Sequence, residues 1–143
     1  MATTEIDLAL SWSNGFKGSG LITGQNFAVP IGIPTVYGGS GEGANPKELL
    51  ASSAAACFIA TLTAILETNK VPVRNLAVST HVVEADSAFS IAHTVQLVLA
   101  NKPAADEVAA IEALVARADK VCTVGNILRK SGVEIEARLG SVE

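Results

Sequence analysis

Residues 41–62, GEGANPKELLASSAAACFIATL, contain the start of a long apolar helix and decide the fold. Asn45 suits the N-cap position and Pro46 suits the first helical position. Glu48 follows Asn45 by three residues, which completes a capping-box pattern. The stretch therefore predicts a helix over about Pro46–Thr68.

This helix is apolar around most of its circumference. Between Leu49 and Leu66 it carries no charged side chain. A helix without a polar face is buried on most sides, and its many Ala and Ser residues allow another helix to approach closely. A chain of 143 residues with one further helix is too small to surround it. We therefore expect a homodimer in which this helix is central.

Alternating apolar residues predict strands on both sides of the helix. The first face, formed by Ile6, Leu8, Leu10 and Trp12, indicates a half-buried strand, and Asn14–Gly15 indicates a hairpin turn after it. The further predictions are one or two strands within 21–33 interrupted by Gly24 and Pro30, strands at 73–85 and 91–101, a helix over about Pro103–Cys122, and a strand at 133–140.

The predicted order of elements is β-β-β-α-β-β-α-β. It defines a single α+β domain, residues 1–143, with a mainly antiparallel sheet and two helices.

The composition excludes several classes of function. Hydrophobic residues make up 49% of the chain and the net charge is −4, so neither nucleic acid nor an anionic membrane surface is an expected partner. The opening residues show no signal peptide, and the apolar helix is shorter than a bilayer span. We expect a soluble protein of the cytoplasm without a membrane segment.

The only two cysteines, Cys57 and Cys122, are the main candidates for chemistry. In a reducing cytosol such a pair is typical of free thiols or a redox couple rather than a structural disulfide. With His81 and His93 they show no zinc-ligand spacing, so neither a metal nor a cofactor is predicted. His93 shares the apolar face of its strand, which indicates a core or interface histidine rather than a base.

Two interpretations of Cys57 follow from its position. It lies eleven residues after Pro46, about 16 Å along the helix axis, where the dipole of its own helix N-terminus no longer acts. If Cys57 reacts as a thiolate, a cation must therefore reach it from elsewhere. Otherwise it is a small buried hydrophobic residue with an inert thiol.

Three stretches resemble the OsmC/Ohr family, the osmotically inducible and organic hydroperoxide resistance proteins. Residues 41–66, GEGANPKELLASSAAACFIATLTAIL, resemble the family signature of a glycine-rich loop, Asn-Pro, a small-residue run and Ala-Cys-Phe. Residues 118–128, ADKVCTVGNIL, resemble the segment of its second cysteine, and residues 11–20, SWSNGFKGSG, resemble its early hairpin.

The resemblance implies an intertwined homodimer of the OsmC/Ohr type that reduces small organic hydroperoxides. It implies that Cys57 is the peroxidatic cysteine, whose thiolate attacks the peroxide, and that Cys122 is the resolving cysteine, which forms a disulfide with it. A dithiol reductant, for which a lipoyl-type dithiol is a candidate, would then reset the pair.

The chain departs from the family where the thiolate is stabilised. The family uses an arginine held by a glutamate directly after Asn-Pro, but Lys47 stands there and Glu48 follows one residue later. No arginine precedes Arg74, so Lys17, Lys47 and Glu48 are the candidates for stabilising the thiolate. The alternative is an impaired family member that binds a small apolar ligand or senses redox state.

Overall fold

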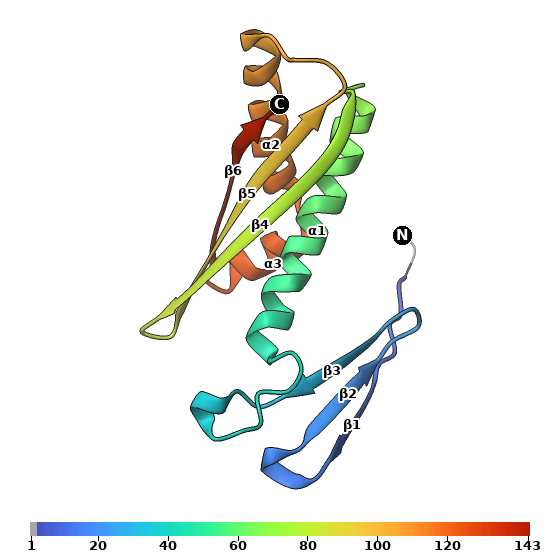
Figure 1. Cartoon of the computed structure of the whole chain (residues 1–143), viewed down its shortest axis with the longest axis vertical. Coiled ribbons are helices and arrows are strands. Elements are labelled where there is room, and N and C mark those ends of the chain that lie inside the picture. The colour runs from blue at the N-terminus through green and yellow to red at the C-terminus, as the bar shows by residue number, and fades with distance from the viewer. Residues whose placement is uncertain (1–2) are drawn as a thin grey trace. The chain divides into compact units, whose positions relative to one another are not determined.

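The computed structural model describes residues 3–143 and divides the chain into two compact units (Figure 1). The first unit ends at Leu50 and the second runs from Ala51 to Glu143. The long helix α1 (Pro46–Thr68) begins in the first unit and continues into the second. The prediction that residues 1–143 act as one domain stays a prediction.

The first unit is a three-stranded antiparallel sheet in the order β1 (Ala9–Ser13), β2 (Ser19–Thr23) and β3 (Ala28–Gly32). The predicted turn at Asn14–Gly15 is confirmed: the two residues have φ angles of 70° and 65°, and Gly15 begins the short 3-10 helix η1 (Gly15–Lys17). A second 3-10 helix, η2 (Thr35–Tyr37), follows β3.

Two expectations for this sheet are wrong. Pro30 does not interrupt a strand but lies inside β3, which pairs with β2 alone in the sheet and therefore tolerates a residue without an N–H. The face of Ile6, Leu8, Leu10 and Trp12 is not half-buried, since these side chains are 41–78% exposed. Among residues 3–50, the helical segments of the first unit are the short 3-10 helices η1 and η2 and the start of α1, and that face stays exposed.

The start of α1 is as predicted. The backbone N–H of Glu48 donates to the Asn45 side-chain oxygen at 2.9 Å, and the Asn45 N–H donates to the Glu48 carboxylate at 3.1 Å. Thr61 and Thr63 donate their hydroxyls to carbonyls four residues earlier, so their polar groups are satisfied within the helix. The expectation that this helix is shorter than a bilayer span is wrong, because its 23 residues and mean hydropathy of 2.1 would be enough to cross a membrane, a property that core helices of soluble proteins share.

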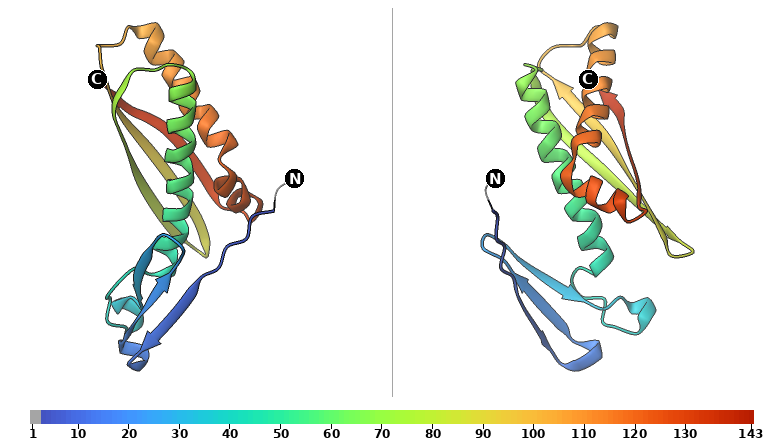
Figure 2. Two further views of the ribbon diagram at one scale, coloured as in Figure 1. Left: turned by 90° about the vertical axis from the view of Figure 1, so that its right-hand side faces the viewer. Right: turned by 180° about the vertical axis from the view of Figure 1, so that it is seen from behind.

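The second unit is a three-stranded sheet with helices on one face (Figure 2). Strand β4 (Val73–Ala85) pairs antiparallel with β5 (Ala88–Leu99), and β5 pairs parallel with β6 (Glu134–Val142). The tight turn at Asp86 and Ser87, both with positive φ, joins β4 to β5. Between β5 and β6 the chain forms α2 (Ala105–Val121) and α3 (Thr123–Lys130).

The core lies between this sheet and the helices. The alternating residues of β5 from Ile91 to Leu99 are buried, as predicted. Leu62 of α1, Val95 of β5 and Val115 of α2 are each at most 1% exposed and belong to the main cluster. Burial of such side chains contributes about 1.5–3 kcal/mol each. The members of this cluster are Phe58, Leu62, Leu66, Val95, Leu97, Leu99, Ile111, Val115, Ala118 and Cys122.

The prediction of two helices is wrong because the chain forms a third one, α3. The expected helix over Pro103–Cys122 is α2, which ends at Val121. Cys122 then takes an extended conformation (φ −66°, ψ 113°), which breaks the helical hydrogen bonding and makes it the N-cap of α3. The candidate cysteine is therefore at a junction between two helices rather than on a helical face.

His93 is a core histidine with a satisfied ring, as expected. It is 2% exposed, and its ring stacks on Phe58 with centroids 4.7 Å apart and planes 7° apart. Its Nδ1 lies 2.8 Å from the Thr80 hydroxyl.

The burial of His93 predicts a loss of stability in acid. Burial lowers the pKa of His93, the Asp119 charge opposes this shift, and Arg129 adds to it. The unfolded chain therefore takes up the proton first, and the free energy of unfolding falls as the pH drops below about 6.5. One such group contributes a slope of at most about 1.4 kcal/mol per pH unit. The free energy of unfolding, measured with urea, should change less steeply with pH between 7.5 and 5 in His93→Gln than in the wild type.

His81→Gln is the matched control, because His81 is exposed on β4. A loss of pH dependence in this variant as large as that in His93→Gln would contradict the assignment of the effect to His93. Equal slopes for the wild type and His93→Gln would contradict a buried, neutral His93.

Candidate thiol site

The structure brings Cys57 and Cys122 together in the second unit. Both are free thiols. Cys57, on α1, is half-buried and packs against the main core cluster, whereas Cys122, at the α2–α3 junction, is only 2% exposed. The two thiols are close enough to shift each other's pKa. The sequence alone left this proximity open.

Backbone N–H groups at the start of α3 influence both thiols. Those of Thr123 and Val124 act to lower the pKa of the Cys57 thiol, and that of Gly125 acts to lower the pKa of Cys122. These are the first N–H groups of α3, which have no partner within the helix. A helix N-terminus carries partial positive charge and favours an anion such as a thiolate.

Thr61, one turn after Cys57 on α1, also reaches the thiol. Its hydroxyl is within hydrogen-bonding contact of the Cys57 sulfur and lies 2.7 Å from the Cys57 carbonyl oxygen. Because a hydroxyl has a single proton, it donates to one of these acceptors at a time. Ionisation of Cys57 favours donation to the sulfur.

These contacts shift the two thiol pKa values in opposite directions. Burial acts to raise the pKa of Cys57, but the hydrogen bonds from Val124, Cys122, Thr61 and Thr123 outweigh it, so that pKa lies below its usual value. Burial raises the pKa of Cys122, the Gly125 N–H opposes this, and the proximity of Cys57 adds to the increase. Cys57 therefore ionises first and Cys122 keeps its proton.

The expectation that only a cation could stabilise the thiolate is wrong. The groups that lower the Cys57 pKa include N–H donors of α3, a helix that was not predicted from the sequence. Two features of the sequence could have indicated where α3 ends: the basic residues Arg129 and Lys130, and the glycine at 132. In the structure Gly132 has a φ of 92°, and its N–H donates to the Arg129 carbonyl at 3.0 Å.

The remaining candidates, Lys17, Lys47 and Glu48, belong to the first unit. Glu48 forms the capping box of α1, Lys17 ends η1 with an exposed side chain, and the Lys47 ammonium donates to the Tyr37 hydroxyl at 3.3 Å. Their role in stabilising the thiolate stays a prediction.

Replacing Thr123 by proline should raise the pKa of Cys57. Proline removes one N–H donor but suits the first helical position, and the extended Cys122 before it fits a residue that precedes proline. A hydrogen bond to a charged group contributes about 1.5–3 kcal/mol, so iodoacetamide alkylation of Cys57 near pH 7 should slow by about tenfold. Thr123→Ala keeps the N–H and should react like the wild type. Equal rates for all three proteins would contradict the role of this N–H.

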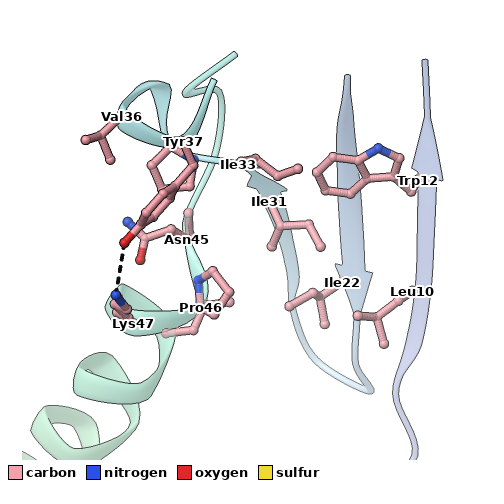
Figure 3. Close-up of a pocket in the computed structure, with 14 residues that line it drawn as sticks. Leu10, Trp12, Ile22, Ile31, Ile33, Val36, Tyr37, Asn45, Pro46 and Lys47 are labelled. Carbon is pink, nitrogen blue, oxygen red and sulfur yellow. Dashed lines mark hydrogen bonds between the residues drawn. The ribbon is translucent and has the colours of Figure 1, made fainter. Parts of the chain in front are cut away.

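The first unit contains an apolar pocket of about 750 Å³ (Figure 3). Trp12 and Leu10 of β1, with Ile22 of β2, line one side, and Tyr37 and Lys47 line the other. The Lys47 ammonium lies 5.7 Å from the centre of the Tyr37 ring as well as bonding to its hydroxyl. The glycine-rich segment between β3 and α1 gave no sequence signal for this pocket.

Comparison with known proteins identifies the class of protein. The sequence pattern of the OsmC-like protein family matches residues 39–138, which include both cysteines. The chain therefore belongs to the OsmC-like protein family. The uncharacterized protein YmaD of Bacillus subtilis (strain 168) is 29% identical over 141 residues, which cover 95% of this chain and 93% of YmaD.

Solved structures share the fold. An OsmC-like protein from Mycoplasma pneumoniae has a TM-score of 0.76 at 16% identity and covers 99% of this chain and 100% of its own. An organic hydroperoxide resistance protein OsmC from Legionella pneumophila has a TM-score of 0.64 at 22% identity, covering 99% of each chain. The α+β fold expected from the sequence is thus confirmed as an OsmC-like fold.

Proposed function

We propose that this protein is a thiol-dependent peroxidase that reduces small organic hydroperoxides through Cys57 and Cys122. The observation that carries the proposal is the asymmetry of the neighbouring thiols: N–H groups of α3 lower the pKa of the half-buried Cys57, whereas burial raises the pKa of Cys122. A nucleophilic thiolate beside a second thiol is the arrangement that a two-cysteine peroxidase requires.

In the first step the Cys57 thiolate attacks the terminal oxygen of the hydroperoxide. The O–O bond breaks, the alkoxide leaves and takes up a proton as the alcohol, and Cys57 becomes a sulfenic acid. Cys122 then attacks that sulfur, its thiol proton and the hydroxide leave as water, and a disulfide forms. A dithiol reductant reduces the disulfide and is itself oxidised, which returns both thiols.

The proposed protein is a cytoplasmic homodimer. Support for the dimer comes from the exposed side of α1 in the single chain, which consists of small residues that allow close helix contact. They include Ser52, Ser53, Ala56, Ala60 and Ala64. Support for the substrate class comes from the Legionella pneumophila relative, which is described as an organic hydroperoxide resistance protein.

Stopped-flow mixing of the reduced protein with cumene hydroperoxide tests the proposal. We expect rapid loss of two thiols per chain, with formation of cumyl alcohol, and repeated turnover once a dithiol is added. Oxidation no faster than that of free cysteine would refute the proposal. Fast oxidation without turnover in the presence of dihydrolipoamide or dithiothreitol would instead indicate a redox sensor.

A second candidate function is the binding of a small apolar ligand, and the pocket of the first unit favours it. This pocket is mostly apolar and lies within the usual size range of small-molecule sites. Trp12 lines it and is the only tryptophan of the chain, so its fluorescence reports on occupancy. Saturable quenching by cumyl alcohol that is weakened in Ile31→Ser would support this function, and the absence of any change would refute it.

A further inference from the structure

Arg129 of α3 connects three elements through its guanidinium group. One terminal nitrogen donates to the Asp119 carbonyl at 3.0 Å and to the Asn126 side-chain oxygen at 2.9 Å. The other donates to the Asp119 carboxylate at 2.6 Å and to the Ile135 carbonyl at 2.9 Å. All four protons on these two nitrogens are therefore used, and they join α3 to α2 and to β6.

The bonds of Arg129 and Asn126 end on the last turn of α2. Arg129 binds the Asp119 carbonyl, and the Asn126 amide donates to the Lys120 carbonyl at 2.9 Å. Carbonyls at a helix C-terminus have no partner within the helix, so side chains of α3 satisfy them here. Both residues lie on α3, after the junction at Cys122, and their bonds to α2 fix the direction in which α3 leaves it.

We propose that Arg129 is a positioning residue that holds the N-terminus of α3 against Cys57. The inference rests on the thiol chemistry proposed above and adds a residue to it. Arg129 is not among the groups that shift the pKa of either thiol, whereas the N–H groups of Thr123, Val124 and Gly125 are. It acts through the backbone N–H groups that it holds in place.

The charges around the thiols favour a positional role over a direct electrostatic one. Asp119 of α2 pairs with Arg129 and offsets its charge, and the Asp119 charge adds to the raised pKa of Cys122. His93 of β5 is buried and kept neutral by its lowered pKa. The part of α1 from Leu49 to Leu66 carries no charge at all.

Alkylation of Cys57 by iodoacetamide as a function of pH tests the proposal. In Arg129→Met the N-terminus of α3 is released, so the pH profile should move upward and the rate near pH 7 should fall by about tenfold. Arg129→Lys keeps the charge but cannot span four acceptors, and it should show a loss of similar size. Restoration of the wild-type profile by lysine would overturn the proposal, because charge alone would then suffice.

Arg138→Met is the matched control. Arg138 lies on β6, is exposed, and its Nε lies 3.4 Å from the Thr94 hydroxyl oxygen, so the alkylation profile of this variant should be that of the wild type. Circular dichroism establishes that each variant is folded.

Should Arg129→Met fail to fold, Asn126→Ala provides a second test. It removes the bond to the Lys120 carbonyl of α2 and the bond from Arg129 within α3, and it should slow alkylation by about threefold. An unchanged rate in that variant would overturn the proposal.

The readout separates this inference from the proposed peroxidase activity. Alkylation requires no peroxide, so shifted profiles in the Arg129 variants support the positioning role even if cumene hydroperoxide is not reduced. A wild-type profile in Arg129→Met overturns the positioning role even if the protein is an active peroxidase.

Discussion

Replacing Cys57 by serine should abolish the reduction of cumene hydroperoxide. A hydroxyl is far less acidic than a thiol, so the N–H groups of Thr123 and Val124 would not generate an anionic nucleophile from it. Loss of a covalent nucleophile lowers turnover by a factor on the order of 10³ or more. The rate measured by loss of peroxide should therefore fall to that of the assay mixture without protein.

The remaining thiol in this variant provides an internal control. Burial raises the pKa of Cys122, so its alkylation near pH 7 should be slow and should increase only in alkaline solution. Continued rapid reduction of peroxide by Cys57→Ser would show that Cys122 is the primary nucleophile. That result would reverse the proposed roles of the two cysteines.

Features that depend on local interactions could be predicted from the sequence. The bounds of α1 agree with the prediction because Asn45, Pro46 and Glu48 form a cap from neighbouring residues. The buried face of β5 also agrees, since alternation along one strand is enough to define it. The parallel pairing of β5 with β6 is different, because periodicity contains no information on strand direction.

The missed helix α3 depends on tertiary contacts. It has only eight residues, and Gly125 within it disfavours a helix. The bonds from Arg129 to Asp119 and Ile135 stabilise it, and they join residues of different elements. The lysine candidates came from the resemblance to a family that uses an arginine, and their role stays a prediction. Both cysteines were predicted as candidates, but most of the groups that distinguish them lie on α3.

Replacing Cys122 by serine should separate the two chemical steps. Serine is a good N-cap and its hydroxyl can donate to the Cys57 thiolate in place of the thiol, so α3 and the first attack on peroxide should be preserved within a few-fold. The sulfenic acid on Cys57 would then have no neighbouring thiol to form a disulfide. We expect one rapid oxidation per chain, and repeated turnover with a dithiol reduced by at least about tenfold.

Cys122→Ala is the matched variant, because it removes both the resolving sulfur and the hydrogen-bond donor. The first oxidation should be slower by several-fold in alanine than in serine, since the Cys122 contact helps to lower the pKa of Cys57. Labelling with dimedone followed by mass spectrometry should detect the sulfenic acid on Cys57 in both variants. Wild-type turnover without a disulfide in Cys122→Ser would contradict the resolving role, because the external dithiol would then reduce the sulfenic acid directly.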